Sequence, residues 1–204
     1  MIISMSENNI FSDESRNICT NLIAVTNRKL SSHTFLEQTE RICLLHPKAL
    51  ILREKDLSED EYKALAVQTM RICSEYSVQC ILHSYPEAAM ELNCRAIHLP
   101  LYLLEKYHNI SENFDIIGSS VHSVEEAVKA QNFGATYITA GHIFTTDCKK
   151  NLPPRGLSFL KDVVSSVSIP VYGIGGIKIN SDQIKKLLDC GAAGGCVMSE
   201  MMKI

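Results

Sequence analysis

The residue best placed to do chemistry in this sequence is His142, because of the segment around it. His142 falls in GHIFTTDCKK, residues 141–150, which ends in two lysines that include Lys149. An unperturbed imidazole titrates at about pH 6.5, so it can take up and release a proton at neutral pH. A lone histidine at a strand end is more often structural, held by one neutral hydrogen bond. The polar motif around His142 favours the acid–base role.

Two segments near the C-terminus could hold a phosphate. GIGGI contains Gly175 and Gly176, and MSEM contains Met198 and Ser199. Glycines let backbone N–H groups approach a phosphate closely. Ser199 is expected to begin a short helix, and a helix N-terminus attracts anions. Tight turns and a helix cap would explain either segment alone, but the two together favour a phosphate site.

A third polar segment, REK, carries Arg53 and Lys55. Two cations separated by one residue point to the same side of a strand. Buried cations are costly unless they are paired. A bound anion is one possible partner, and an internal salt bridge with Glu126 or Asp147 is the alternative.

Short apolar runs must position these groups. Each run has about the length of a strand and is nearly continuous in apolar character, which is typical of strands covered on both faces, as in parallel sheets. The runs are residues 21–27, 49–55, 79–83, 96–100, 115–121, 136–143, 170–177 and 194–199.

Helix start and stop signals separate the runs. Ser58 with Glu61, and Ser123 with Glu126, have the spacing of a capping box. Two glycines fall where helices should end, and one proline falls where a helix can begin: Gly134, Gly191 and Pro86.

Eight strands, with a helix after each of the first seven, predict parallel βαβ units. A closed (β/α)8 TIM barrel is favoured over an open doubly wound sheet, because eight parallel strands can close around their own side chains. No GxGxxG follows the first run, which also argues against a dinucleotide-binding sheet. In a barrel, the polar segments would all lie at the carboxyl ends of the strands, where such folds bind ligands.

The predicted barrel is a single domain, residues 21–204, preceded by a partly ordered N-terminal arm, residues 1–20. The chain stops five residues after Ser199, so the eighth outer helix is expected to be missing or truncated to a turn. That leaves an apolar groove, which the arm or a neighbouring subunit could cover. Homo-oligomerisation therefore stays open.

Charge and composition indicate which classes of binding partner this protein lacks. The net charge is -3 and charged residues make up 21%, which gives no sign of a nucleic-acid surface or a basic membrane patch. No apolar run is long enough for a membrane span, and the N-terminus lacks the pattern of a signal peptide. The eight cysteines include no CxxC pair and fall mostly at apolar positions, as expected for buried reduced thiols in a cytoplasmic protein.

Taken together, these motifs resemble the thiamine phosphate synthase and thiazole tautomerase superfamily. The matching pieces are LREK (52–55), IHLP (97–100), IGSSVHSVEEA (117–127), GHIFTTDCKK (141–150), GIGGI (173–177) and VMS (197–199). The resemblance runs from about Asn21 to Ser199. It implies a phosphate- or substrate-binding set of Arg53, Lys55, Ser120, Thr146, Lys149, Gly175, Gly176, Met198 and Ser199.

The synthase branch fits less well. That enzyme joins a pyrimidine pyrophosphate to a thiazole phosphate with Mg²⁺, which is held by an Asp of an Asn-Asp pair after strand three and by an Asp after strand four. This sequence has His83 and Ser84 at the first place and 101–103, LYL, at the second. Because Mg²⁺ wants oxygen ligands, these replacements are expected to remove the metal site. The synthase also usually has Pro where this chain has His142, and Cys148 replaces a Thr.

The tautomerase branch has the Gly-His-apolar-Phe and Thr-Asp-Cys-Lys-Lys pattern of residues 141–150. The resemblance thus implies aromatisation of a thiazole carboxylate phosphate tautomer in thiamine biosynthesis, without metal or organic cofactor. His142 would move the proton, and Arg53 or Lys55 would hold the carboxylate. Two alternatives remain: a synthase with an altered metal site, and a non-catalytic thiazole phosphate-binding regulatory relative. For His83, His98 and His122 a structural role is favoured.

Overall fold

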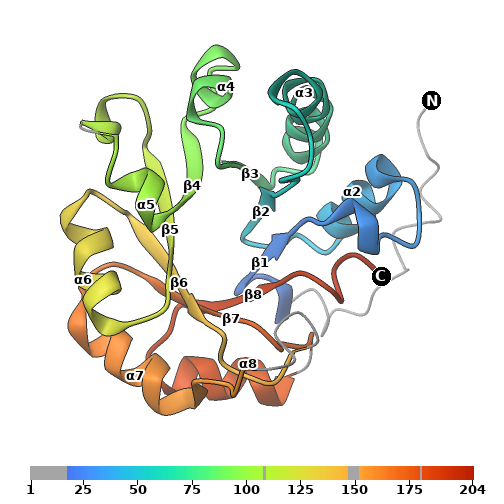
Figure 1. The fold of residues 1–204 in the computed structure, drawn as a ribbon. Helices are drawn as coiled ribbons and strands as arrows, with labels where there is room; N and C mark the ends of the chain where they lie inside the picture. Colours follow the sequence, from blue (N-terminus) through green and yellow to red (C-terminus); the bar gives the residue numbers. More distant parts are fainter. Residues whose placement is uncertain (1–17, 108, 147–151, 180) are drawn as a thin grey trace.

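The computed structural model describes residues 18–107, 109–146, 152–179 and 181–204. Within them, eight strands form a closed barrel in chain order, and helices surround it (Figure 1). All neighbouring pairs are parallel, and β1 meets β8 with Ile23 opposite Cys196. The strands are β1 Leu22–Val25, β2 Ala49–Leu52, β3 Gln79–His83, β4 Ala96–Pro100, β5 Ile116–Val121, β6 Tyr137–Gly141, β7 Val171–Ile174 and β8 Gly194–Val197. The predicted closed barrel is confirmed, and the open sheet is excluded.

A helix follows each of the first seven strands, as predicted. They are α2 Phe35–Leu44, α3 Glu59–Glu75, α4 Pro86–Glu91, α5 Leu101–Leu104, α6 Val124–Asn132, α7 Gly156–Ser166 and α8 Ser181–Asp189. Two short 3-10 helices, η1 Arg28–Leu30 and η2 Ile110–Glu112, lie in the loops.

The predicted helix signals behave largely as expected. Ser58 and Glu61 form a complete capping box at α3. Ser123 caps α6 by accepting from the backbone N–H of Glu126, but the Glu126 carboxylate accepts from the backbone of His122 instead of closing the box. Gly134 and the other predicted terminal glycine both have positive φ, and Pro86 opens α4.

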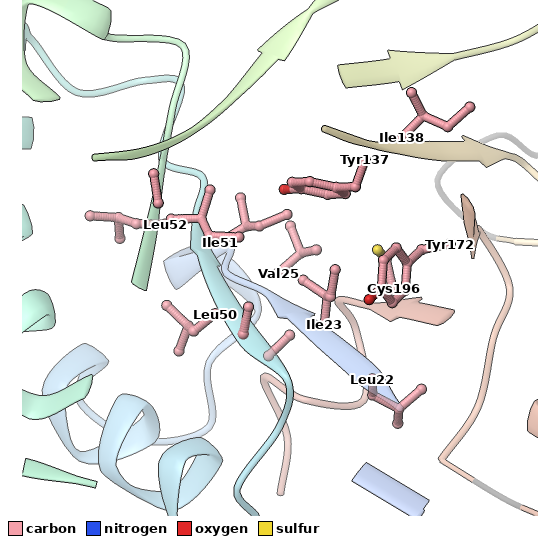
Figure 2. Packing of buried hydrophobic residues seen from close by; sticks show 14 of the residues in the cluster. Leu22, Ile23, Val25, Leu50, Ile51, Leu52, Tyr137, Ile138, Tyr172 and Cys196 are labelled. Atoms are coloured by element: carbon pink, nitrogen blue, oxygen red, sulfur yellow. The ribbon is translucent and has the colours of Figure 1, made fainter. Parts of the chain in front are cut away.

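The barrel is filled by side chains from its own strands. Ile23, Tyr137, Tyr172 and Cys196 converge from β1, β6, β7 and β8 (Figure 2), and all four are buried. Gly118 of β5 makes room for Tyr137, because a Cβ there would lie 2.2 Å from Cζ of that residue. The outer faces of the same strands are buried under helices, which explains why the strands are apolar throughout.

The chain after β8 forms a turn and no helix. The expectation that Ser199 begins a short helix is therefore wrong. Met201 and Met202 are nevertheless fully buried. Gln38 of α2 donates to the carbonyl of Met201, and both Gln38 and Arg41 donate to that of Ile204. The C-terminal turn thus packs beside α2, where the C-terminus lies in Figure 1. This turn follows β8 in place of the outer helix that follows each other strand.

The expectations for the N-terminal arm, the cysteines and membrane spans can be compared with the described residues. Cys19, inside the segment assigned to the arm, is fully buried, so packing on the barrel begins before residue 21; residues 1–17 lie outside the described part. All seven described cysteines are free thiols, and Cys148 lies outside the described residues. No helix of the described chain is long and apolar enough to cross a membrane.

Candidate functional site

The carboxyl ends of the strands bring most of the predicted site residues to one end of the barrel, which we call the mouth. Arg53 and Lys55 directly follow β2, and Ser120 lies near the end of β5. His142 directly follows β6. Three further predicted groups directly follow β7 and β8: Gly175, Gly176 and the 198–199 pair of Met198 and Ser199. Lys149 lies outside the described residues.

A buried carboxylate anchors the segment that carries the two cations. Glu54, 2% exposed, accepts from the hydroxyl of Thr26 at 2.8 Å and from the backbone and guanidinium of Arg28. The Thr26 hydroxyl in turn accepts from the backbone N–H of Arg53 at 2.9 Å. The backbone of Arg53 is therefore fixed through Thr26 to a charge that the fold holds in place.

The side chains of Arg53 and Lys55 form no ion pair with any described residue. The predicted alternative of a salt bridge to Glu126 has no support, since that carboxylate accepts from the backbone of His122; Asp147 lies outside the described residues. Burial, and then the positive charge of Arg53, lower the pKa of Lys55. Two cations with no counter-ion in the described chain make the mouth attractive to an anion.

Two stacked histidines lie beneath these cations. His83 and His98, on adjacent positions of β3 and β4, have ring centroids 5.6 Å apart. Burial lowers the pKa of both histidines, and the positive charges of Lys55 and Arg53 lower it further. The neighbouring His98 also lowers the pKa of His83. For His98 the pKa falls to about 3. Both rings are therefore neutral at neutral pH.

His98 belongs to a chain of hydrogen bonds inside the barrel. Its Nδ1 lies 3.0 Å from Oη of Tyr137, and its Nε2 lies 2.8 Å from Oγ of Ser120. Thr139 donates to the same Ser120 oxygen at 3.2 Å. His83 has a partner too, the hydroxyl of the adjacent Ser84 at 2.7 Å. Both histidines have hydrogen-bond partners within the fold, which agrees with the structural role expected for them, but the sequence showed neither partner of His98.

His142 is 6% exposed and packs against the loop that directly follows β7, which contains Gly175 and Gly176. We call this segment the β7 loop. Nε2 of His142 donates to the carbonyl of Leu152 at 3.3 Å, and the Gly141–His142 peptide bond is cis. His122 lies beside it, with Nδ1 donating to the carbonyl of Gly141 at 2.9 Å. That bond ties the end of β5 to the end of β6, so a structural role suits His122.

The glycines of the β7 loop have a packing reason of their own. A Cβ on Gly175 would lie 2.3 Å from Cβ of His142, and one on Gly176 would lie 2.3 Å from the carbonyl oxygen of Thr145. Both have positive φ. Within the described chain, the backbone N–H groups of Gly175, Gly176 and Ser199 donate to no acceptor. The glycines therefore serve packing, while their N–H groups stay available to a ligand.

A magnesium ion of the kind the synthase branch uses would need carboxylates free to bind it. In the segments that follow strands, Glu54 and Asp56 are engaged by Arg28, and Arg28 with Lys29 holds the pKa of Asp56 well below its usual range. Glu126 and Glu200 accept from backbone N–H groups. The positions expected to carry metal ligands hold His83, Ser84 and the apolar start of α5. The described residues therefore do not fit Mg²⁺.

Sequence reasoning missed two buried residues that shape the site, Glu54 at the mouth and Tyr137 inside the barrel at the start of β6. Glu54 sits between the two cations of REK, and an acid flanked by bases is the signal that could have identified a local anchor. Tyr137 gave no signal, because an aromatic residue in an apolar strand looks like core. Thr146, a predicted ligand group, is half-buried in the loop after β6.

Comparisons with known proteins point in one direction. The family model of thiamine monophosphate synthase matches residues 22–201. A putative thiamine-phosphate synthase 2 of Aquifex aeolicus is 34% identical over 175 residues, 85% of this chain and 92% of that protein. The thiamine-phosphate synthase of Clostridium acetobutylicum is 31% identical over 193 residues, 92% and 89% of the two chains. The solved thiamine phosphate pyrophosphorylase of Pyrococcus furiosus superposes with a TM-score of 0.75 at 29% identity, covering 92% of this chain and 89% of that one. These names favour the synthase over the tautomerase.

Proposed function

The chain belongs to the thiamine monophosphate synthase family, and on that premise we propose that it binds a thiazole phosphate at the mouth and tautomerises it. The family places the chain in thiamine biosynthesis. The observation that carries the choice of reaction is His142, buried directly after β6, together with acids at the mouth that are already bound by protein groups.

The phosphate would be bound by the ends of β7 and β8. The backbone N–H groups of Gly175, Gly176 and Ser199 have no acceptor in the described chain, which supports this placement. The helix dipole expected at Ser199 is absent, so the phosphate depends on these N–H groups and on the cations of the mouth. Arg53 and Lys55 supply positive charge at the end of β2, where they would hold the carboxylate of the substrate.

The proton transfer is assigned to His142. Aromatisation removes a proton from the ring carbon that bears the carboxylate and adds one at the exocyclic carbon, so no net proton or electron is exchanged. With the Nε2 proton donated to Leu152, a neutral His142 ring carries its lone pair on Nδ1. Nδ1 would take the proton and return it to the second carbon. Hydrogen bonds of catalytic groups are often long before substrate binds, as the 3.3 Å contact to Leu152 is.

The test is turnover of the thiazole carboxylate phosphate tautomer by His142→Ala. Positioned acid–base catalysis contributes roughly 10²–10⁴-fold, so kcat should fall by that order while affinity for the aromatic product is kept. Rates are read above the uncatalysed aromatisation. His33→Ala, an exposed histidine near α2, is the control and should match the wild type. An unchanged kcat in His142→Ala would remove the residue from the mechanism.

The synthase remains a second candidate, because the matched relatives carry that name. The discriminating assay supplies a pyrimidine pyrophosphate and a thiazole phosphate with Mg²⁺ and measures thiamine phosphate. Product whose formation depends on Mg²⁺ would replace the tautomerase with the synthase. Binding of the thiazole phosphate with neither reaction would instead indicate the non-catalytic regulatory relative.

A further inference from the structure

Tyr137, His98 and Ser120 are joined by hydrogen bonds inside the barrel. Which atom donates in each of these bonds follows from the partners available to Tyr137. Tyr137 is 6% exposed, and the one hydrogen-bond partner of its hydroxyl among the described residues is Nδ1 of His98. If the imidazole donated from Nδ1, the buried phenol proton would have no acceptor. An unpaired buried donor costs roughly 1–3 kcal/mol, so the favoured arrangement has Tyr137 donating to Nδ1.

That arrangement fixes the other end of the ring. A neutral imidazole that accepts at Nδ1 carries its proton on Nε2. Burial keeps His98 neutral and raises the pKa of Tyr137 well above its ordinary value, which agrees with a phenol that keeps its proton. Nε2 of His98 then donates to Oγ of Ser120.

The hydroxyl of Ser120 is thereby left with a proton that it can donate. Its oxygen accepts from His98 at 2.8 Å and from Thr139 at 3.2 Å, which uses both lone pairs. Its own proton has no acceptor in the described chain. Ser120 is half-buried near the end of β5, so this proton is available to an acceptor that enters the mouth.

A glycine in β5 allows the rings of Tyr137 and His98 to lie close together. At Gly118 a Cβ would lie 2.2 Å from Cζ of Tyr137 and 2.4 Å from Nδ1 of His98. Any side chain on that residue of β5 would push the phenol and the imidazole apart. A glycine in the middle of a strand usually weakens it, and this one is explained by the close approach of the two rings.

We propose that Tyr137 and His98 are positioning residues that set Ser120 as a hydrogen-bond donor to the bound thiazole phosphate. The proposal rests on the function given above only for the identity of the ligand. Tyr137→Phe keeps the ring packing but removes the donor to Nδ1. Nδ1 is then unpaired in either tautomer, so the preference for a proton on Nε2 that the phenol imposes is lost, and Ser120 can donate to Nε2 instead of to the ligand.

Binding of the aromatic thiazole carboxylate phosphate, measured by calorimetry, tests the coupling. Ser120→Ala should weaken binding by about tenfold, the effect of one hydrogen bond, and Tyr137→Phe should weaken it by less, because it only releases the direction of the same donor. The double variant should bind no more weakly than Ser120→Ala, because both changes act on one hydrogen bond. Additive losses would mean that Tyr137 is only structural and would overturn the proposal.

Tyr172→Phe is the matched control. Tyr172 lies in the same part of the barrel (Figure 2) with its ring at 89° to that of Tyr137, and its hydroxyl makes no hydrogen bond in the described chain. Its removal should leave affinity unchanged. Thermal unfolding of every variant identifies any loss that comes from misfolding.

Nitrogen-15 NMR of labelled histidine decides the tautomer without any ligand. The His98 signals, assigned by their loss in His98→Gln, should show a protonated Nε2 and a bare Nδ1 in the wild type. In Tyr137→Phe the proton should no longer be confined to Nε2, and part of it should appear on Nδ1. A wild-type proton on Nδ1 would refute the proposal. If the thiazole ligand fails to bind the wild type, the proposed function fails, while this experiment still decides the tautomer.

Discussion

Replacing Glu54 by Ala tests how the fold holds the cationic side of the mouth. The change removes a carboxylate that is 2% exposed and leaves two donors without an acceptor: the fully buried hydroxyl of Thr26 and the backbone N–H of Arg28. The guanidinium of Arg28 keeps Asp56 as a partner, so no isolated charge is created.

The expected cost follows from the two unpaired donors. Each unsatisfied group costs roughly 1–3 kcal/mol, with the half-buried N–H of Arg28 near the lower limit, so Glu54→Ala should destabilise the protein by about 3 kcal/mol. In a chain of this length that corresponds to a fall in Tm of roughly 6–12 °C. Urea unfolding followed by circular dichroism measures the free energy directly.

Asp56→Ala provides the control, because it removes the exposed carboxylate that binds the same guanidinium. Exposed ion pairs contribute little, so its unfolding curve should stay close to the wild type. If both substitutions cost the same, the buried Glu54 is not the anchor described above. Loosening of Arg53, whose backbone is held through Thr26, should also weaken anion binding in Glu54→Ala alone.

Two further predictions follow from the mouth. Because the folded-state pKa values of His83 and His98 lie below those of unfolded histidine, the unfolded chain binds more protons and stability is lost as the pH falls below about 6.5. Between about pH 7 and pH 5, His98 alone should cost about 2 kcal/mol, with His83 adding in the same direction; a flat urea midpoint over this range would contradict it. Gly175→Ala should reduce Tm and activity more than Gly156→Ala: both need positive φ, but only at Gly175 does the new Cβ meet a neighbour, at 2.3 Å, whereas Gly156 faces open space. Equal losses would show that φ alone decides.

The names of the relatives and the chemistry of the site favour different reactions. Overall similarity reports the shared barrel, which a synthase and a tautomerase would both need. The reaction depends on a few side chains at strand ends, where His142, His83 and Ser84 stand in this chain. Assays of both reactions are therefore the decisive measurement.

The sequence by itself determined the eight strands, the order of elements and the closed barrel, because buried parallel strands are apolar on both faces and helix caps depend on neighbours within a few residues. It also located the cations after β2 and the histidine after β6, since strand ends can be read from where apolar runs stop.

Only the tertiary structure decided what those groups contact. The partners of Glu54, on Thr26 and Arg28, and the bond between His98 and Tyr137 join residues at least 26 positions apart. A turn stands where a helix was expected at Ser199, and Gln38 of α2 donates to the carbonyls of that turn from more than 160 positions away. Barrel closure brings distant strands together, and side-chain pairs across it leave no periodic trace in a single sequence.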